Sequence, residues 1–415
     1  MTNGASRCAG WGSVPTPEAA SARRPAPDFD PLQPETFDSA HAQYAGLRSR
    51  CPVAHADAYG GFWALARHAD VAAVLADPAT YVTSVQNVVP KVAFTGRRPP
   101  LHFDPPEHTP YRAVLNPLLA PERVARLEPA VRGYAAETLA PLLAAGRGDA
   151  CQDYAAKVPV RVFGRWMQLP VELEAELHEA GPAFVRAVEA AQHDAMKETS
   201  LVLYGMARRL LELRRREPLD PTIDPASAML AARIDGRPFD DEMIVGMVRQ
   251  VLVVGIVAPL VVMGSITVHL ARDSELQHRL RDEPSLLPQA IEEFLRLYTP
   301  YRGFARTATR DVEIGGRRVA KDEPIALLYA SANRDEALFA DGASFVLDRP
   351  NLREHLAFGR GPHYCAGAAL ARIELRVMLH ELLARTRSFD LDGPIQMSPF
   401  PEIGPSSVPL RLSAA

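Results

Sequence analysis

The residues whose chemistry stands out lie in a short glycine-rich segment around Cys365. The segment reads Phe358-Gly359-Arg360-Gly361-Pro362-His363-Tyr364-Cys365-Ala366-Gly367, which predicts a tight turn followed at once by a helix. A sulfur at a helix N-terminus faces unpaired N–H groups and the positive end of the helix dipole, and both favour the thiolate. Glycines also let the backbone approach a flat cofactor closely. The segment therefore favours metal ligation by Cys365, and a buried structural cysteine is the alternative.

This segment resembles the haem-binding signature F-x-x-G-x-x-x-C-x-G of the cytochrome P-450 family. It matches at Phe358, Gly361, Cys365 and Gly367. The resemblance implies haem b (iron protoporphyrin IX) as cofactor, with Cys365 as the metal ligand and Phe358 beside the cofactor. A thiolate ligand pushes electron density to iron and favours cleavage of the O–O bond. His363 occupies a position where the family commonly places a histidine that binds a haem propionate.

Three more basic residues match family positions that bind the haem propionates. The stretch from Asp104 to Arg112 looks like the family's D-P-P-x-H-x-x-x-R motif and places His108 and Arg112 one helical turn apart. Arg306 matches a third position. Because haem carries two carboxylates, burying them requires paired donors. The resemblance therefore implies that these three residues bind the cofactor, although each alone is also typical of a solvated surface residue.

Glu293 and Arg296 form an E-x-x-R pair about 70 residues before Cys365. Their spacing places both charges on one helix face, as in many ordinary surface ion pairs. At this distance from the cysteine segment the pair resembles the family's E-x-x-R motif. The resemblance implies a structural role, in which the two residues pair with each other and with Arg349 and brace an irregular segment.

The long apolar helix predicted before this pair departs from the family pattern. Most members carry an acid followed by an alcohol there, and the two are thought to deliver protons to bound oxygen. Counting back from Glu293 places Val257 at the acid position and Ala258 at the alcohol position, after Gly255. Pro259 lacks an N–H group, so we expect a kink that opens toward the haem. Either this is a packing change in an ordinary enzyme, or water, substrate or peroxide supplies the protons.

Family analogy predicts a mostly apolar substrate pocket. The candidate lining residues are Val253, Val254, Ile256 and Phe304. Hydrophobic burial would hold an apolar or aromatic molecule there. Arg360 and Arg372 flank Cys365 and are candidates for a face that docks an acidic electron donor, although exposed arginines usually have no partner.

A mainly α fold with a small β region is expected to position these residues. Helical patterns cover residues 120–145, 172–217, 240–272, 286–298 and 366–386, and strand patterns cover 61–66, 312–319 and 324–329. Residues 333–363 show little periodicity. The resemblance implies the cytochrome P-450 fold, an α-rich triangular prism around a buried haem. We expect residues 1–36 to be a flexible arm and residues 37–415 to be one haem domain.

The composition narrows the functional class. The chain has 415 residues, and Lys and Arg total 46 against 50 Asp and Glu, a net charge of −4. This balance disfavours nucleic-acid binding. The four cysteines lack a Cys-x-x-Cys pair, and no secretory signal is visible, so we expect a cytoplasmic protein. The uncharged stretch Val251–Leu270 is long enough to span a membrane, but its Gly and Pro residues favour a central helix of the core.

The sequence thus predicts a monomeric haem-thiolate oxidoreductase that hydroxylates or dealkylates a small apolar or aromatic organic substrate with O2. Because the chain ends about 50 residues after Cys365, we expect electrons from a separate ferredoxin and ferredoxin reductase or a similar donor. An atypical haem-thiolate enzyme is the alternative, because Val257-Ala258 replaces the acid-alcohol pair. Such an enzyme would be peroxide-driven, dehydrating or radical-coupling. A haem-binding sensor without catalytic activity is a third interpretation.

Overall fold

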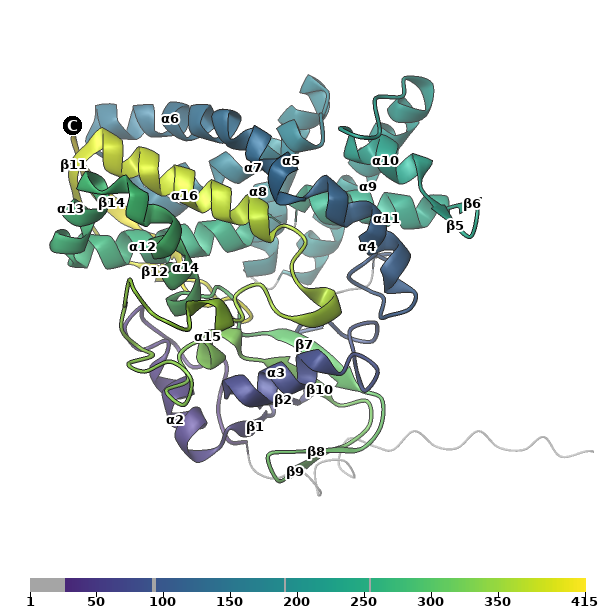
Figure 1. Ribbon diagram of the computed structural model, residues 1–415, viewed down its shortest axis with the longest axis horizontal. Helices are drawn as coiled ribbons and strands as arrows, with labels where there is room; N and C mark the ends of the chain where they lie inside the picture. Colours follow the sequence, from purple (N-terminus) through teal and green to yellow (C-terminus); the bar gives the residue numbers. More distant parts are fainter. Residues whose placement is uncertain (1–26, 92–94, 190–191, 254) are drawn as a thin grey trace, which may run out of the picture.

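A layer of helices lies above a smaller lobe that contains a β-sheet in the computed structural model, which describes residues 27–91, 95–189, 192–253 and 255–415 (Figure 1). The α-helices are α2 (Ala42–Arg50), α3 (His68–Ala76), α4 (His108–Leu118), α5 (Pro121–Val124), α6 (Glu128–Ala145), α7 (Lys157–Trp166), α8 (Val171–Glu189), α9 (His193–Arg216), α10 (Pro225–Ala231), α11 (Asp241–Val253), α12 (Val257–Arg272), α13 (Ser274–Asp282), α14 (Leu287–Leu297), α15 (Tyr329–Ala332) and α16 (Ala368–Arg385). Helices therefore dominate the described chain, as predicted.

The largest sheet has five strands in the order β1-β2-β10-β7-β3. Only the pair of β10 with β2 is parallel, and the other neighbours are antiparallel. These strands are β1 (Val53–Ala56), β2 (Phe62–Leu65), β3 (Tyr81–Val82), β7 (Phe304–Ala308) and β10 (Pro324–Leu327). The sheet joins the N-terminal quarter of the chain to the segment that follows α14, so residues far apart in sequence meet in this lobe.

The remaining strands form small sheets. A three-stranded sheet has the order β11-β14-β4, and the pairs β5–β6, β8–β9 and β12–β13 are separate. Their bounds are β4 (Arg147–Asp149), β5 (Arg233–Ile234), β6 (Arg237–Pro238), β8 (Val312–Ile314), β9 (Arg317–Val319), β11 (Thr386–Leu391), β12 (Gln396–Met397), β13 (Pro405–Ser407) and β14 (Pro409–Ala414). The predicted hairpin at 312–319 is confirmed, with its turn at Gly315 and Gly316, both in the left-handed region.

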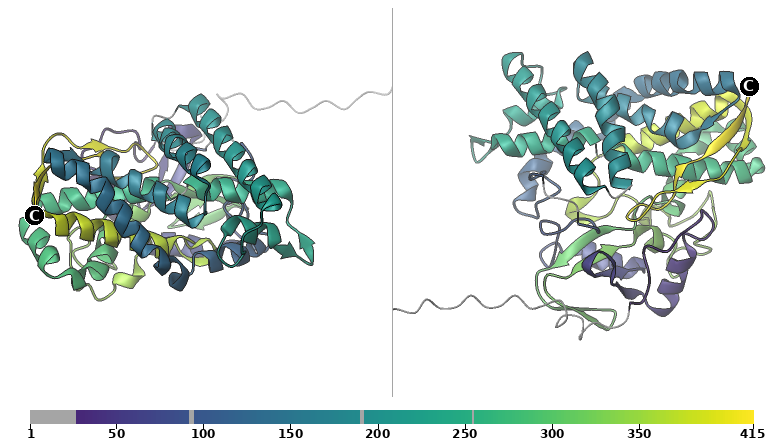
Figure 2. Two further views of the ribbon diagram at one scale, coloured as in Figure 1. Left: turned by 90° about the horizontal axis from the view of Figure 1, so that it is seen from above. Right: turned by 180° about the vertical axis from the view of Figure 1, so that it is seen from behind.

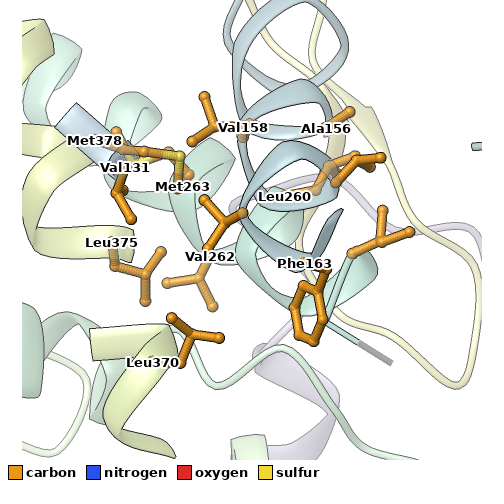
Figure 3. Close-up of a cluster of buried hydrophobic side chains, with 14 of the residues drawn as sticks. Val131, Ala156, Val158, Phe163, Leu260, Val262, Met263, Leu370, Leu375 and Met378 are labelled. Atoms are coloured by element: carbon orange, nitrogen blue, oxygen red, sulfur yellow. The ribbon is translucent and has the colours of Figure 1, made fainter. Parts of the chain in front are cut away.

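Four helices pack around the main hydrophobic core. Figure 3 shows buried side chains from α6, α7, α12 and α16 pointing toward one another. The labelled residues include Val131, Phe163, Val262, Leu375 and Met378. α16 packs against both α6 and α14, and Figure 2 shows the same helices side by side from above. This packing fixes the start of α16, and hence the position of the cysteine segment before it.

The predicted helix over 240–272 is interrupted near its middle. α11 ends at Val253, and Gly255 and Ile256 form a turn before α12 begins at Val257. Pro259 therefore lies in the first turn of α12, where a missing N–H group costs no helical hydrogen bond. The expected kink is present, but it lies one turn before the proline. A Cβ atom on Gly255 would lie 1.9 Å from the Phe163 ring, so this turn requires glycine.

The segment Asp241–Arg272, which combines α11 and α12, passes a length and hydropathy test for a membrane span. Its most apolar window is 81% buried inside the protein. That burial agrees with the prediction of a central helix within the core.

The predicted flexible arm over residues 1–36 is wrong at its C-terminal end. The Asp28 N–H donates to the His55 carbonyl at 2.8 Å, Phe29 is buried, and Glu35 pairs with Arg302 at 2.6 Å. These contacts attach the chain to the β lobe from residue 28 onward. Residues 1–26 lie outside the described part of the chain.

Candidate functional site

The cysteine segment forms a compact hairpin-like loop before α16. The Cys365 N–H donates to the Phe358 carbonyl at 2.9 Å, and the Tyr364 N–H donates to the Gly361 carbonyl at 3.0 Å. Gly361 has a φ of +73°, and a Cβ atom there would lie 2.7 Å from the Leu75 carbonyl oxygen. This position therefore requires glycine for both its conformation and its close packing. The helix begins at Ala368, so a two-residue turn separates it from Cys365.

The Cys365 sulfur accepts a hydrogen bond from the N–H group of Gly367. Burial nevertheless raises the pKa of the thiol, and it outweighs the opposing effects of this N–H, Arg112 and Arg372. Contrary to the sequence prediction, the start of the helix alone therefore does not stabilise the thiolate enough to lower the pKa of Cys365. A cation bound at the sulfur would supply the missing stabilisation, since metal binding releases the thiol proton.

Cys365 combines an accessible side chain with close protein surroundings. The Cys365 side chain is accessible to solvent, yet protein surrounds it closely enough for burial to dominate its pKa. Figure 1 shows the segment before α16 between the helical layer and the sheet that contains β7 and β10. An accessible sulfur with close protein surroundings suits ligation of a bound group.

His108 and His363 lie next to each other at one edge of this site. Their ring centroids are 4.5 Å apart, and His363 Nε2 lies 3.3 Å from Asp104 Oδ1. The Asp104 carboxylate also accepts hydrogen bonds from the N–H groups of Thr83 and Ser84, and these contacts hold its pKa far below the usual range despite burial. Burial, with His363 and Arg112 nearby, lowers the pKa of His108 to about 4. Asp104 thus positions His363, a role that the first residue of the D-P-P-x-H motif could have suggested.

Arg112 and Arg306 are guanidinium groups without a carboxylate partner in the described chain. Arg112, on α4, makes no ion pair there and lies near enough to the Cys365 sulfur for each to affect the other's pKa. Arg306, on β7, is 6% exposed and contacts the Ala305 carbonyl at 2.9 Å and the Tyr329 hydroxyl. Buried cations without counter-ions are costly unless an anion binds them. This donor set fits the two carboxylates of haem.

Glu293, Arg296 and Arg349 meet as predicted. Glu293 and Arg296 are fully buried and form a two-point ion pair with distances of 2.7 Å, and Arg349 Nε lies 3.1 Å from Glu293 Oε1. Arg296 also donates to three backbone carbonyls, those of Asn333, Gly342 and Ser344. This cluster ties α14 to the irregular segment 333–363, where the described structure contains only short turns and 3₁₀ helices.

The distal positions contain no proton donor. Val257 and Ala258 are half-buried in the first turn of α12. Ile256 is 1% exposed, belongs to the hydrophobic core and lies beside Gly181 of α8, and its place in a substrate pocket stays a prediction. Val253 is the last residue of α11, and its side chain lies outside the described part of the structure. Val254 lies outside the described residues altogether. Phe304 begins β7, and its ring centroid lies 4.6 Å from that of Tyr301, with the two rings tilted.

The two arginines that flank Cys365 both have acidic partners. Arg372 pairs with Glu292 at 2.5 Å, and its guanidinium lies 4.4 Å from the Phe358 ring centroid. Arg360 pairs with Glu354 at 2.9 Å. A face that docks an acidic electron donor was predicted from two unpaired arginines, but both Arg360 and Arg372 are paired with acids.

Comparisons with known proteins agree with this geometry. The sequence model of the family described as Cytochrome P450 matches residues 182–405. Cytochrome P450 130 of Mycobacterium tuberculosis is 32% identical over 88% of this chain and 92% of its own length, and linalool 8-monooxygenase of Pseudomonas putida is 30% identical over 85% and 90%. The structure of cytochrome P450 CYP109Q5 from Chondromyces apiculatus superposes with a TM-score of 0.85 at 30% identity, covering 93% of this chain and 98% of that one.

The agreement extends over nearly all of the described fold, so the structure has the P450 fold that the sequence motifs implied. Relatives named as monooxygenases and hydroxylases support an enzyme, and the sensor interpretation is not retained. The chain therefore belongs to the cytochrome P450 family and is a monooxygenase of that family.

Proposed function

We propose that this enzyme holds haem b through the Cys365 thiolate and inserts one oxygen atom of O2 into a small organic substrate. The reaction converts R–H, O2, two electrons and two protons into R–OH and water, and dealkylation follows where the hydroxylated carbon bears a heteroatom. The observation that carries the proposal is the Cys365 sulfur, accessible yet enclosed, with the Gly367 N–H group donating to it.

The chain's own residues would hold the cofactor as follows. Cys365 would ligate iron, Phe358 would lie beside the cofactor, and His108, Arg112 and Arg306 would provide positive or donor groups for the two propionates. His363 takes part through its contact with Asp104. When bound, the haem supplies oxygen activation, and the thiolate favours O–O cleavage. The protein's part is to fix the sulfur, neutralise the propionates and enclose the substrate.

Electrons would come from a separate ferredoxin and its reductase or a similar donor. We place the enzyme in the cytoplasm as a monomer whose residues 28–415 form one haem domain. Because Arg360 and Arg372 are ion-paired, an acidic donor would meet the wider proximal surface rather than these two cations alone.

The distal side favours a second candidate, an atypical haem-thiolate reaction that uses peroxide, dehydrates its substrate or couples radicals. Val257 and Ala258 can neither donate nor relay a proton. Ordered water at the turn of Gly255 and Ile256 is the simplest replacement, and it would keep the O2 reaction. Product formation with peroxide alone, compared with NADH, ferredoxin, reductase and O2, separates the two candidates.

The decisive experiment is the absorption spectrum of the reduced protein with carbon monoxide. We expect a Soret band at the position typical of thiolate ligation, and its loss in Cys365→Ser. Cys51→Ser is the matched control, because Cys51 is a half-buried cysteine in the β lobe. A Cys365→Ser protein with an unchanged spectrum would refute the proposal.

Restoring the family's alcohol tests the distal side. We expect Ala258→Thr to change the share of NADH consumption that yields product, because a hydroxyl in the first turn of α12 can bind and orient water. Unchanged coupling would mean that proton delivery is controlled elsewhere.

A further inference from the structure

Two arginines are buried on the distal side without an acidic partner in the described chain. Arg249, on α11, is 1% exposed, and Arg98, in the segment before α4, is 9% exposed. Arg249 Nη2 donates to the Ser200 hydroxyl at 2.8 Å, and Arg98 Nη2 lies 3.1 Å from His102 Nε2. The Nε atom of each arginine is buried and has no hydrogen-bond partner. The two side chains are thus only partly satisfied.

The groups around Arg249 and Arg98 carry charge of one sign. Burial and the positive charge of Arg98 lower the pKa of Arg249 to about 9. Burial and three arginines, Arg98, Arg97 and Arg249, lower the pKa of His102 to about 4. Among the described residues, Tyr204 is the acidic group that raises the pKa of both Arg249 and Arg98, and its phenol is neutral at pH 7. Buried like charges destabilise a fold, so a compensating anion is expected at this place.

Arg249 lines a small pocket of about 20 Å³. Its lining combines basic, hydroxyl and apolar side chains, and we call it the Arg249 pocket: Thr95, Arg98, Phe184, Met196, Lys197, Ser200 and Arg249. The Thr95 and Ser200 hydroxyl oxygens are 2.9 Å apart, and the Arg249 guanidinium lies 4.8 Å from the Phe184 ring centroid. No carboxylate lines it among the described residues.

A second cavity of about 220 Å³ adjoins the Arg249 pocket at Thr95. It is lined by Gly96, Leu201 and Met243 among others, and by one acid, Glu242. That acid is already paired with Arg208 at 2.8 Å, so it does not neutralise Arg249. The buried Tyr204 hydroxyl in this cavity has no hydrogen-bond partner in the described chain and is a further free donor.

Arg249 lies on α11, the helix that comes directly before the distal turn and α12 in the chain. Arg249 precedes Val257 by eight positions, and the turn of Gly255 and Ile256 lies between them, so their separation is at most the roughly 12 Å of an unbroken helix of that length. A molecule with its charged end at Arg249 and a body of roughly ten atoms would reach the distal turn of Gly255 and Ala258. Phe184 and Met196 offer apolar surface beside the charged end.

We propose that the substrate is an organic carboxylate whose carboxylate group binds Arg249 and Arg98 while its apolar body extends toward Val257 and Ala258. This inference rests on the proposed function and names its substrate class. A planar guanidinium matches a carboxylate through two parallel hydrogen bonds, and the Ser200 and Thr95 hydroxyls can donate to the same oxygens. Arg249 and Arg98 are then specificity-determining residues, and they favour an acid over the alcohol or hydrocarbon of equal length.

The test compares ten-carbon probes that differ only in the head group. Decanoate, methyl decanoate, decanol and decyltrimethylammonium are titrated into the haem-loaded protein, with binding measured by calorimetry and by the shift of the ferric Soret band. We expect decanoate to bind at least about tenfold more tightly than decanol or the ester, and the cation to bind most weakly, because a charge-assisted hydrogen bond is stronger than a neutral one.

Arg249→Met should weaken decanoate binding by about 10- to 100-fold and change decanol binding by less than about threefold. Arg249→Lys keeps the charge and should recover part of the affinity, and Arg98→Met should show a smaller loss of the same kind. Arg215→Met is the matched control, because Arg215 lies on α9 and pairs with Asp241 at the surface. It should leave all four affinities unchanged.

Equal affinities of decanoate and decanol, or an equal loss of both in Arg249→Met, would overturn the inference. The carbon monoxide spectrum of each variant keeps this result separate from the proposed function: a thiolate spectrum with no preference for decanoate refutes the substrate class alone. If Arg249→Met does not fold, Arg98→Met and Arg249→Lys carry the same comparison, and decanoate should then raise the melting temperature of the unaltered protein more than decanol does.

Discussion

Two buried arginine clusters in this protein differ in how completely the chain itself satisfies them. Arg296 makes five hydrogen bonds, to both oxygens of Glu293 and to three backbone carbonyls. A guanidinium has five N–H donors, so all are used. Arg249 makes one hydrogen bond, to Ser200, and lies near another cation instead of an anion. The first cluster is complete within the protein, whereas the second is complete only with an added anion.

This difference shows how a buried cation can be assigned a role. Desolvation costs are similar for both arginines, since Arg296 and Arg249 are 0% and 1% exposed. What differs is whether fixed acceptors offset that cost. A guanidinium with fixed acceptors stabilises the segment that carries those acceptors, here residues 333–363. A guanidinium without them lowers stability until an anion binds, which is typical of a ligand site.

The largest effect is expected from breaking the satisfied cluster. Glu293→Gln would leave Arg296 and Arg349 buried without a counter-ion, and we expect a loss of about 3–5 kcal/mol in the free energy of unfolding. Urea unfolding of the haem-loaded protein, followed by far-UV circular dichroism, measures this loss. Glu283→Gln, which removes an exposed partner of Arg279, is the control and should cost under about 1 kcal/mol. A loss below about 1 kcal/mol for Glu293→Gln would contradict the bracing role.

A smaller effect is expected from Glu292, the next residue along the chain. Burial raises the pKa of this carboxyl, but hydrogen bonds from His355 and Arg372 outweigh it and lower the pKa to about 2. A depressed pKa contributes stability above pH 4.5 that is lost as the pH falls toward 2. Glu292→Gln should therefore lower stability by about 2 kcal/mol at pH 7, with some discount for partial exposure, and the difference should shrink between pH 4.5 and 2.

Urea unfolding at a series of pH values measures this trend. A difference between Glu292→Gln and the unaltered protein that stays constant from pH 7 to pH 3 would show that the lost stability does not come from the carboxylate charge.

The stability of the unsatisfied cluster should change much less when its arginine is replaced and no ligand is added. Arg249→Met removes a buried charge and its repulsion with Arg98, and it loses one hydrogen bond and the contact with Phe184. Because these effects oppose one another, we expect the free energy of unfolding to change by no more than about 1 kcal/mol. Arg296→Met is the matched comparison and should destabilise by several times more. A loss above about 2 kcal/mol for Arg249→Met would identify Arg249 as a structural ion.

The features that depend on the spacing of residues close together in the chain were predicted from the sequence. The cysteine loop, the Glu293–Arg296 pair and the hairpin at 312–319 follow from residues near one another in the chain, where a short motif or turn determines the structure. The kink before α12 was predicted from Pro259, but the break lies at Gly255 and Ile256, because a proline is accommodated in the first turn of a helix. Sequence alone could indicate the break but not its position.

The features that sequence reasoning missed depend on tertiary contacts. Arg98 and Arg249 are about 150 residues apart, and only the fold shows that both are buried without an acid. Asp104 is the first residue of the D-P-P-x-H motif, but only the fold shows that its carboxylate faces His363. Residues 28–36 resemble a disordered arm in composition, yet Asp28, Phe29 and Glu35 find partners in the β lobe. In each case the role of the residue depends on a contact with a side chain that is distant in the sequence, and only the fold shows that contact.

The smallest effect is expected at a third kind of arginine, one that is paired but exposed. Arg215 lies 2.6 Å from Asp241, at the start of the helix that carries Arg249, and the two side chains are 43% and 70% exposed. Water solvates each charge when the other is removed, so Arg215→Met and Asp241→Asn should each change the free energy of unfolding by about 0.5 kcal/mol or less. Both should lose that small effect in 1 M salt, because screening is strong at the surface. A salt-independent loss above about 1 kcal/mol would mean that the effect of an arginine here depends on its helix and not on its burial, and the contrast between Arg296 and Arg249 would then need another explanation.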